Sequence, residues 1–366
     1  MPSAKDIYLI VLPSLTLGGC ETQGLFYARI IANSRVGTPI FVNLGREGEL
    51  VPLLDFYGFK YFSVNSSPFY QSGRFQKIFI LLRLALVLRK YKPKHIIAQS
   101  YWPNLFAGVV WRFTGATRFF WIQGSVDSEL GMTIWEKIAK IFRPTYLANS
   151  QASWEFIKKR HNLKSNSPII YNALDIPELY PKEKKECLQL IMVANFFPEK
   201  DFETLLRAFS KTLETYPNCI LNLVGKSPGN DLKMNKMKAL AFDLKLGRKV
   251  IFHGPVKDVS ELLRSADIGI LSTFSEGLSN SLLEYMAYGL PILATIIAPN
   301  KEALGENNFR WLFTPKDVVK LTALLSELCS DESLRKEIGK KNRERAIELF
   351  SFNAFQERFL DILRQN

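Results

Sequence analysis

The sequence repeats one pattern along its length: a short apolar run, followed by a longer segment with helical periodicity. In the first half, strands are predicted at Asp6–Leu12, Thr38–Asn43, Tyr61–Val64, His95–Gln99, Arg118–Ile122, Thr145–Asn149 and Pro168–Tyr171. Helices are predicted between them, including Thr22–Asn33, Phe75–Tyr91 and Gln151–Arg160. Strands that alternate with helices indicate βαβ units, and therefore an α/β fold built on a parallel sheet.

The pattern stops near the middle of the chain and then restarts. The segment Asn172–Glu186 contains Pro177, Pro181 and a charged run, which is typical of an interdomain linker. Beyond it, strands are predicted at Leu188–Ala194, Cys219–Val224, Lys249–His253, Ile268–Ser272 and Pro291–Ala294. Helices are predicted at Phe202–Thr215, Leu232–Leu244, Val259–Ser265, Ser281–Tyr288 and Val318–Leu328. Because 366 residues are many for one core, we expect two doubly wound, Rossmann-like domains.

The expected domains are residues 1–175 and residues 176–350, and ligands of such sheets bind at the carboxyl ends of the strands and in the cleft between domains. The last stretch, Glu332–Arg364, predicts a helix that is rich in phenylalanine. We expect residues 351–366 to pack back on the N-terminal domain. The alternative is a helix that only completes the second domain, since periodicity does not identify packing partners.

Composition excludes several classes of protein. Four cysteines without a CxxC pair, and only three histidines, predict neither a disulfide framework nor a zinc site, and they suit a reducing cytoplasm. The run Ile7–Leu12 predicts a strand rather than a secretory signal. The longest apolar stretch, Ile78–Leu88, is too short to span a bilayer and contains Arg83.

The net charge of +13 is unevenly distributed along the chain. Residues 1–180 carry 21 basic and 11 acidic residues, whereas residues 181–366 carry 27 and 24. A basic N-terminal half indicates an anionic partner, such as a membrane surface or a phosphorylated acceptor, although a generally basic protein is the alternative. Nucleic acid is not expected, because no zinc-finger, RRM or KH signature is present.

The predicted helix Phe75–Tyr91 has an apolar middle and basic ends. It suits contact with anionic lipid. Its nearly continuous apolar run favours the other interpretation, a helix packed in the core with solvated ends.

Three segments contain candidate binding residues. Gly18 and Gly19 lie between the first strand and a helix, where a close backbone approach and a helix N-terminus suit an anion. Lys200 follows the first strand of the second half, and its ammonium group could neutralise a diphosphate. Each motif is common by itself, and a solvated turn is the alternative in both cases.

The third segment, residues 275–284, has Glu276 in a loop and Glu284 in the first turns of a helix. Carboxylates accept hydrogen bonds from vicinal hydroxyls, so one could hold a sugar and the other a ribose. The alternative is structural, because Ser281 and Glu284 have the spacing of a capping box and Asn280 could be the N-cap. Spacing alone does not decide between them. The three histidines are expected to be packed or solvated rather than catalytic.

Together and in this order, these segments resemble retaining glycosyltransferases of family 4, which have the two-domain GT-B fold. The segment SEGLSNSLLEYMAYGLPILAT resembles the E-x7-E signature of that family, and PEKDFETLLRAF, LNLVGKS, VIFHGPV, ADIGILSTF and IIYNALD resemble other landmarks. The resemblance is strongest from Leu188 to Lys320 and looser from Ile7 to Asp175.

The resemblance implies a role for each matching residue. Lys200 would contact the donor diphosphate, Glu284 the ribose, and Glu276 the transferred sugar. The amides of Gly277, Leu278, Ser279 and Asn280 would lie beside that sugar. Gly18 and Gly19 would face the phosphates or the acceptor, and the backbone at Gly254 and Val256 would border the base. No cofactor or metal is implied, so Lys200 and helix dipoles would stabilise the leaving diphosphate.

The sequence departs from the family pattern at two positions. Asn195 stands where the family often has an arginine, so Lys200 would neutralise more of the charge. Gln123 stands nearest to the histidine that the family has after an N-domain strand. Glutamine can bind a sugar hydroxyl, but it cannot relay a proton. The departure at Gln123 affects the catalytic prediction more than the prediction of donor binding.

The resemblance therefore implies a retaining, metal-independent transferase that moves a sugar from a UDP- or GDP-sugar to a hydroxyl acceptor. Lipopolysaccharide, capsule or another cell-surface polysaccharide would be the product, made in the cytoplasm at the inner face of the membrane. The basic N-terminal domain would contact anionic lipid. The alternative is a non-catalytic subunit that binds nucleotide sugars, and an epimerase is disfavoured by the scarcity of histidine.

Overall fold

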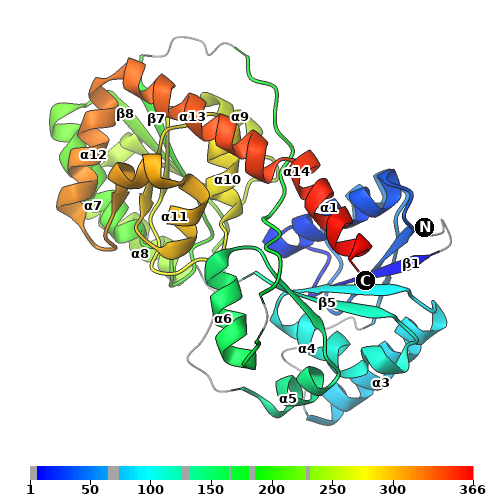
Figure 1. The fold of residues 1–366 in the computed structure, drawn as a ribbon. Coiled ribbons are helices and arrows are strands. Elements are labelled where there is room, and N and C mark those ends of the chain that lie inside the picture. The colour runs from blue at the N-terminus through cyan, green and yellow to red at the C-terminus, as the bar shows by residue number, and fades with distance from the viewer. Residues whose placement is uncertain are drawn as a thin grey trace. The chain divides into compact units, whose positions relative to one another are not determined.

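The computed structural model describes residues 6–64, 74–124, 132–164, 166–180, 186–227 and 231–365. Contacts divide the chain into a first unit, Met1–Ala173 with Gln356–Asn366, and a second unit, Leu174–Phe355. Each unit contains one six-stranded parallel sheet with helices on both faces (Figure 1).

The sheet of the first unit has the strand order β3-β2-β1-β4-β5-β6. Its strands are β1 (Ile7–Leu12), β2 (Thr38–Asn43), β3 (Lys60–Ser63), β4 (His95–Gln99), β5 (Arg118–Gln123) and β6 (Thr145–Ala148). The order reverses between β1 and β4, which pair directly with each other. In doubly wound sheets, ligands bind beyond the carboxyl ends of the strands at such a reversal.

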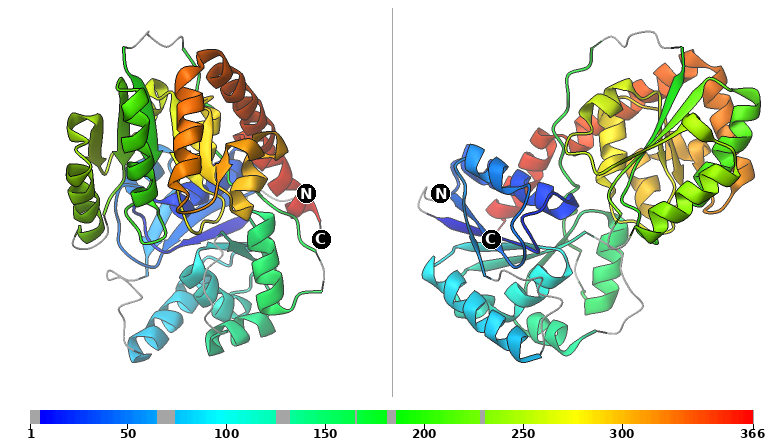
Figure 2. Two further views of the ribbon diagram at one scale, coloured as in Figure 1. Left: turned by 90° about the vertical axis from the view of Figure 1, so that its left-hand side faces the viewer. Right: turned by 180° about the vertical axis from the view of Figure 1, so that it is seen from behind.

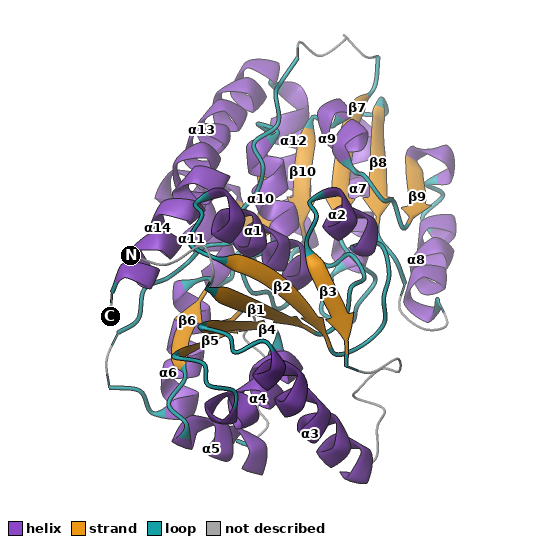
Figure 3. Ribbon diagram, turned by 90° about the vertical axis from the view of Figure 1, so that its right-hand side faces the viewer, coloured by secondary structure: helices purple, strands orange, loops and turns teal. Residues whose placement is uncertain are grey.

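Eight helices are described in or around the first unit, of which α1 and α2 cover one face of the sheet and α3, α4 and α5 the other (Figure 3). They are α1 (Gly19–Asn33), α2 (Val51–Phe56), α3 (Arg74–Lys90), α4 (Tyr101–Val110), the 3-10 helix η2 (Trp111–Phe113), α5 (Ile134–Ile141), α6 (Gln151–His161) and α14 (Phe352–Arg364). The core beneath α3 to α5 consists of apolar strand residues such as Leu9, Ile96 and Trp121, all buried.

The sheet of the second unit repeats the same topology, in the order β12-β11-β10-β7-β8-β9. Its strands are β7 (Leu188–Val193), β8 (Cys219–Val224), β9 (Val250–Gly254), β10 (Ile268–Leu271), β11 (Ile292–Thr295) and β12 (Leu312–Phe313). The reversal lies between β7 and β10, which are hydrogen-bonded neighbours. The predicted α/β fold with two doubly wound sheets is therefore confirmed.

The helices of the second unit begin at side-chain caps in several places. They are α7 (Phe202–Thr215), α8 (Leu232–Asp243), η3 (Gly247–Lys249), α9 (Ser260–Ser265), α10 (Asn280–Ala287), α11 (Ala298–Leu304), η4 (Glu306–Trp311), α12 (Val318–Ser330) and α13 (Glu332–Phe350). Asp201, Asp317 and Asp331 accept hydrogen bonds from backbone N–H groups in the first turns of α7, α12 and α13. Such caps satisfy amides that have no partner within the helix.

The end of the chain returns to the first unit, as predicted. Tyr27 of α1 and Phe359 of α14 form an edge-to-face pair with ring centroids 4.8 Å apart, and Arg118 donates to the backbone oxygen of Ile362 over 3.0 Å. Figure 2 shows this red helix beside the blue helices of the first unit.

The helical prediction for Glu332–Arg364 is wrong at one residue, Ser351, because the stretch forms two helices, α13 and α14. Ser351 interrupts it with an extended backbone and forms a parallel bridge with Leu174. The Ser351 hydroxyl then accepts a hydrogen bond from the N–H of Ala354, which starts α14.

The predicted strand Pro168–Tyr171 is also wrong. Only Ile169 forms a bridge there, to Ala148, and Pro168 has no N–H to donate to a ladder. The two-residue strand β12 was not predicted. Among the described residues, no helix has the length and apolar content that crossing a bilayer requires.

Candidate active site

Two loops meet at the strand-order reversal of the second unit, one after β7 and one after β10. Lys200 forms an antiparallel bridge with Thr273. The N–H of Asp201 donates to the oxygen of Ser272 over 2.9 Å, and the N–H of Phe274 donates to the oxygen of Glu199 over 2.8 Å. These bonds hold the two loops together at the sheet edge where ligands of this topology bind.

Lys200 and Glu276 form an ion pair between these loops. The side chain of Lys200 is 10% exposed and that of Glu276 is 18% exposed. A cation and a carboxylate in partial contact with water are available to a ligand that carries both a charged group and hydroxyl groups. The two residues lie 76 positions apart in the chain, so the structure brings together what the motifs suggested separately.

Sequence reasoning missed Lys233 of α8, which holds the loop that carries Lys200. Its Nζ donates to the backbone oxygens of Phe197, Pro198 and Lys200 over 2.6, 3.0 and 2.6 Å. Burial lowers the pKa of Lys233, while neighbouring acidic residues oppose that shift. An ammonium group has three N–H donors, and here all three have an acceptor. No sequence signal marks Lys233, because its partners are backbone atoms.

Glu284 lies on α10, and its pKa is strongly perturbed. Burial raises the pKa of Glu284 to about 7, and the negative charge of Asp258 adds to the rise. Within the described part of the chain, the Glu284 carboxyl group has no hydrogen-bond or ion-pair partner. Glu284 is half-buried. A carboxyl group that loses water without gaining a partner is costly for the fold, and such groups gather at functional sites.

The alternative in which Glu284 only caps its helix is wrong. The helix begins at Asn280, its N-cap is Ser279, and no side chain caps it. Ser281 already lies inside the helix, so it cannot form a capping box with Glu284. Leu278 and Ser279 are buried at this helix start, next to the partly exposed Gly277.

Asn195 has a structural contact. Its Oδ1 accepts a hydrogen bond from the N–H of Lys226 over 3.0 Å, which ties the loop after β7 to the loop after β8. The two loops can approach this closely only with a glycine at position 225, because a Cβ there would lie 2.1 Å from the oxygen of Ala194. The N–H of Gly225 donates in turn to Gly254 at the end of β9, whose φ of +67° favours glycine.

Val256, which was predicted to border the base, is 36% exposed two residues beyond Gly254. The histidines of both units are packed against neighbours. His253 pairs with Asn222 over 2.9 Å, and His161 pairs with Tyr146 over 2.8 Å. Burial lowers the pKa of His95 and of His161 to about 4, so neither carries a charge at neutral pH.

In the first unit, α1 begins at Gly19 with Gly18 as its N-cap. The carboxylate of Glu21 is buried at this helix start, and the Ser14 hydroxyl donates to it over 3.0 Å. A Cβ on Gly18 would lie 2.5 Å from Glu21 Oε2. A carboxylate at this point repels a phosphate and suits a ligand that donates hydrogen bonds, so of the two predicted roles the geometry favours the acceptor.

Gln123 is the last residue of β5, at the carboxyl edge of the first sheet. Its Oε1 accepts a hydrogen bond from the indole N–H of Trp121 over 3.4 Å, and its backbone oxygen accepts from Asn149. The same edge holds Gly18 and Gly19, at the end of the loop after β1. The predicted acceptor residues therefore belong to the first unit, and the donor residues to the second.

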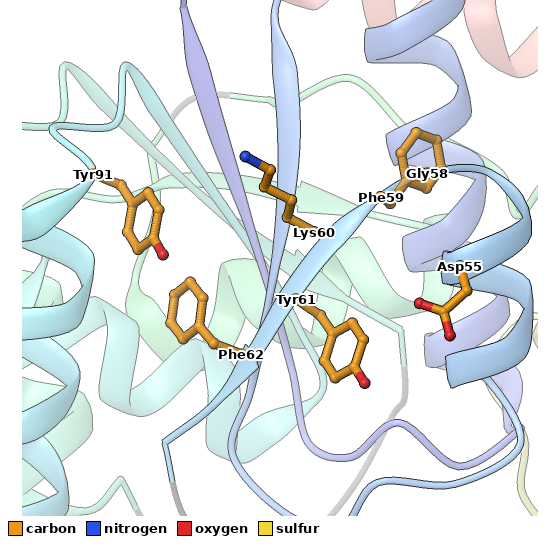
Figure 4. A pocket seen from close by; sticks show the side chains of 7 residues that line it. All are labelled: Asp55, Gly58, Phe59, Lys60, Tyr61, Phe62 and Tyr91. Carbon is orange, nitrogen blue, oxygen red and sulfur yellow. The ribbon is translucent and has the colours of Figure 1, made fainter.

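A hollow of about 440 Å³ lies along the edge strand β3 (Figure 4). On one side of the strand, Phe62 stacks on Tyr91 with ring centroids 5.1 Å apart, near Lys60; Tyr61 and Asp55 lie on the other side. None of the predicted site residues lines this hollow. In the described residues, no group of three His, Cys, Asp or Glu side chains is arranged to hold a metal ion.

Comparison with solved structures identifies the fold. Over 98% of this chain and 99% of the other, the structure resembles Anabaena HepE, solved in complex with UDP and glucose, with a TM-score of 0.83 at 16% identity. The fold is therefore that of the GT-B glycosyltransferases.

Residues 178–345 match the model of the family "Glycosyl transferases group 1". An N-acetyl-alpha-D-glucosaminyl L-malate synthase from Bacillus anthracis is 26% identical over 231 residues, which are 58% of this chain and 59% of that protein. The lipopolysaccharide core biosynthesis glycosyltransferase LpsE from Rhizobium meliloti is 24% identical over 174 residues, 48% of this chain and 49% of LpsE. The alignments thus span about three fifths or less of these relatives.

Proposed function

We propose that the protein is a retaining glycosyltransferase, which moves a sugar from a UDP- or GDP-sugar to a hydroxyl acceptor in the synthesis of a cell-surface polysaccharide such as lipopolysaccharide or capsule. The observation that carries the proposal is the Lys200–Glu276 pair at the strand-order reversal of the second unit. The family match of that unit, the UDP bound by Anabaena HepE and the lipopolysaccharide role of LpsE support it.

In the proposed reaction, the bond between the anomeric carbon and the diphosphate oxygen breaks, and the diphosphate keeps the electron pair. The acceptor hydroxyl oxygen forms the new bond to that carbon. Lys200 neutralises the charge that develops on the diphosphate, without a metal or other cofactor, and this electrostatic stabilisation is a large term in such reactions. Glu276 accepts hydrogen bonds from the transferred sugar, and Glu284 from the ribose.

The proton of the acceptor hydroxyl must be transferred to a base. Gln123 cannot take it, and His95, His161 and His253 are packed against other residues. The departing diphosphate oxygen is a base that lies next to the attacking hydroxyl when both occupy the same face of the sugar. We therefore assign the proton to the diphosphate. This route requires attack from the face that the leaving group vacates, which preserves the anomeric configuration.

The proposed location is the cytoplasm at the inner face of the membrane, with a glycan or lipid-linked acceptor. All four cysteines are free thiols, which suits a reducing compartment.

The test is nucleotide release. The purified protein is incubated with a panel of UDP- and GDP-sugars, with and without lipid-linked acceptors, and the released nucleotide and the anomeric configuration of the product are measured. Lys200→Met and Glu276→Gln should each reduce turnover at least about 100-fold, because each removes a charged contact to the transition state. Lys211→Met, which removes an exposed lysine from α7, should leave turnover unchanged.

The second candidate is a nucleotide-sugar-binding subunit without activity of its own. Gln123 favours it, because this position offers no proton acceptor. Tight donor binding without turnover on any acceptor would support the subunit and contradict the enzyme. A product with the inverted anomeric configuration would contradict the retaining mechanism but not the glycosyltransferase activity.

A further inference from the structure

Helix α3 has two apolar faces, and only one of them lies in the core of the first unit. Ile80, Leu81, Leu84 and Leu88 are buried against the sheet and α4. On the opposite face, large apolar side chains are exposed to solvent: Ile78 at 48%, Phe79 at 66%, Leu82 at 61% and Leu86 at 71%. The interpretation of α3 as a helix packed in the core therefore accounts for one face and leaves the other unexplained.

The exposed residues lie at positions i, i+1, i+4 and i+8, which places them in one stripe along the helix. The stripe continues onto neighbouring elements. Phe113 of η2, which packs on α3, is 61% exposed, and its ring meets Phe142 at the end of α5 with centroids 5.7 Å apart. Ile141 of α5 is 72% exposed. Exposed apolar side chains that gather on neighbouring elements in this way indicate an interaction site.

The charges around this surface have one sign. From Arg74 to Gly124 the sequence contains nine basic residues and no acidic residue. Arg83, Arg89 and Lys90 of α3 are exposed, as are Arg112 beside Phe113 and Lys137 and Lys140 of α5. The acidic residue of α5, Glu136, is buried and paired with Arg160 through two hydrogen bonds of 2.7 and 2.9 Å. The occupant of the surface must therefore accept both apolar side chains and a row of cations.

We propose that the outer face of α3, with Phe113 and Ile141, docks the protein on an anionic lipid bilayer. Apolar side chains would enter the boundary between headgroups and acyl chains, while the arginine and lysine stems extend to the lipid phosphates. A second copy of the chain fits less well, because a twofold interface would set this basic surface against itself. Lipid binding goes beyond sugar transfer and does not depend on it.

The test is co-sedimentation of the full chain with vesicles. One set contains equal parts of phosphatidylglycerol and phosphatidylcholine, and the other contains phosphatidylcholine alone. We expect the chain to bind the anionic vesicles and to bind the neutral ones at least about tenfold more weakly. Affinity for the anionic vesicles should fall as salt screens the charges. Failure to bind anionic vesicles, or equal binding to both sets, would overturn the proposal.

Two variants locate the surface. Leu82→Gln combined with Leu86→Gln should weaken binding to anionic vesicles about tenfold or more, since two exposed apolar side chains no longer enter the bilayer. The matched control is Phe242→Gln with Val319→Gln, which changes two apolar side chains of the second unit that are 82% and 73% exposed. The control should bind as the unchanged chain does; equal loss in both would overturn the assignment to α3.

A third variant separates charge from apolar contact. It combines Arg83→Gln, Arg89→Gln and Lys90→Gln. The affinity for the anionic vesicles should fall about tenfold or more, and the difference in affinity between anionic and neutral vesicles should disappear. Size-exclusion chromatography completes the test. If the chain is a dimer that Leu82→Gln and Leu86→Gln dissociate while vesicle binding persists, the occupant is a second copy and the lipid proposal fails.

Discussion

At the scale of single residues, the proposed donor site consists of three charged side chains with different surroundings. Lys200 and Glu276 neutralise each other across two loops. Glu284 has no such partner within the described residues, and burial raises its pKa to about 7. A ligand that donates hydrogen bonds to Glu284 would remove part of the cost of keeping it there, which is why this residue suits the diol of a ribose.

The raised pKa of Glu284 makes stability depend on pH. Its pKa is about 4.5 when unfolded and about 7 when folded, so ionisation above pH 4.5 favours the unfolded chain. The penalty grows from about pH 4.5 to about pH 7 and is constant above, on the order of 3 kcal/mol. Glu284→Gln should therefore raise the free energy of unfolding by that order at pH 8 and change it little at pH 4, measured by urea denaturation.

Glu348→Gln is the control, since Glu348 is an exposed glutamate of α13. It should change stability little at either pH. A Glu284→Gln chain that is less stable than the unchanged chain at pH 8 would mean that the carboxylate has a stabilising partner, which contradicts the account of this residue.

At the scale of elements, the geometry of the site depends on hydrogen bonds between the loops that follow the strands and the helices that begin there. The loop after β7 is held by the loop after β10 on one side and by Lys233 of α8 on the other. The N-cap of α7, Asp201, also accepts the N–H of Lys316 over 3.2 Å. Lys200 is thus positioned by partners from three other segments, and the precision of its placement depends on them.

Lys233 is a positioning residue in this account. Lys233→Met removes the donor to three backbone oxygens and should weaken UDP affinity about tenfold while leaving uridine affinity unchanged, because only UDP reaches Lys200 through its phosphates. Unfolding free energy should fall by about 1–3 kcal/mol. Calorimetric titration and urea denaturation measure the two effects.

Lys233→Arg should restore part of the UDP affinity, since an arginine can donate to the same oxygens. Lys236→Met, on the same helix and exposed, should change neither quantity. Equal loss of UDP and uridine affinity in Lys233→Met would indicate general disruption of the unit rather than loss of positioning.

At the scale of the whole molecule, the sequence predicts most of the fold because buried parallel strands are strongly apolar and alternate with helices. Prediction from the sequence fails where contacts between distant segments determine the local structure. Nothing in the periodicity of Glu332–Arg364 reveals that Ser351 pairs with Leu174 and breaks the helix. The strand β12 has two residues, too few for any pattern.

The candidate site, like the fold, could be predicted only in part. Its charged side chains stand in motifs, so Lys200, Glu276 and Glu284 could be predicted from sequence. The spacing of Ser281 and Glu284 could not distinguish a helix-capping role of Glu284 from a ligand-binding role. The distinction depends on the residue at which α10 begins. Lys233 was missed, since contacts with backbone atoms leave no local mark in the sequence. For the helix Phe75–Tyr91, both lipid contact and core packing were predicted as alternatives, and its periodicity could not show which side chains are exposed.

In the proposed donor site, Lys200 contacts the diphosphate of a nucleotide bound to the second unit. The most direct measurement is calorimetric titration of the full chain with UDP, GDP, uridine and guanosine, for the unchanged protein and for Lys200→Met. We expect Lys200→Met to weaken the affinity for the preferred nucleoside diphosphate about 10- to 100-fold and to leave the affinity for its nucleoside unchanged. Lys211→Met should change neither affinity. If Lys200→Met binds the diphosphate as tightly as the unchanged chain, the proposed donor site is wrong.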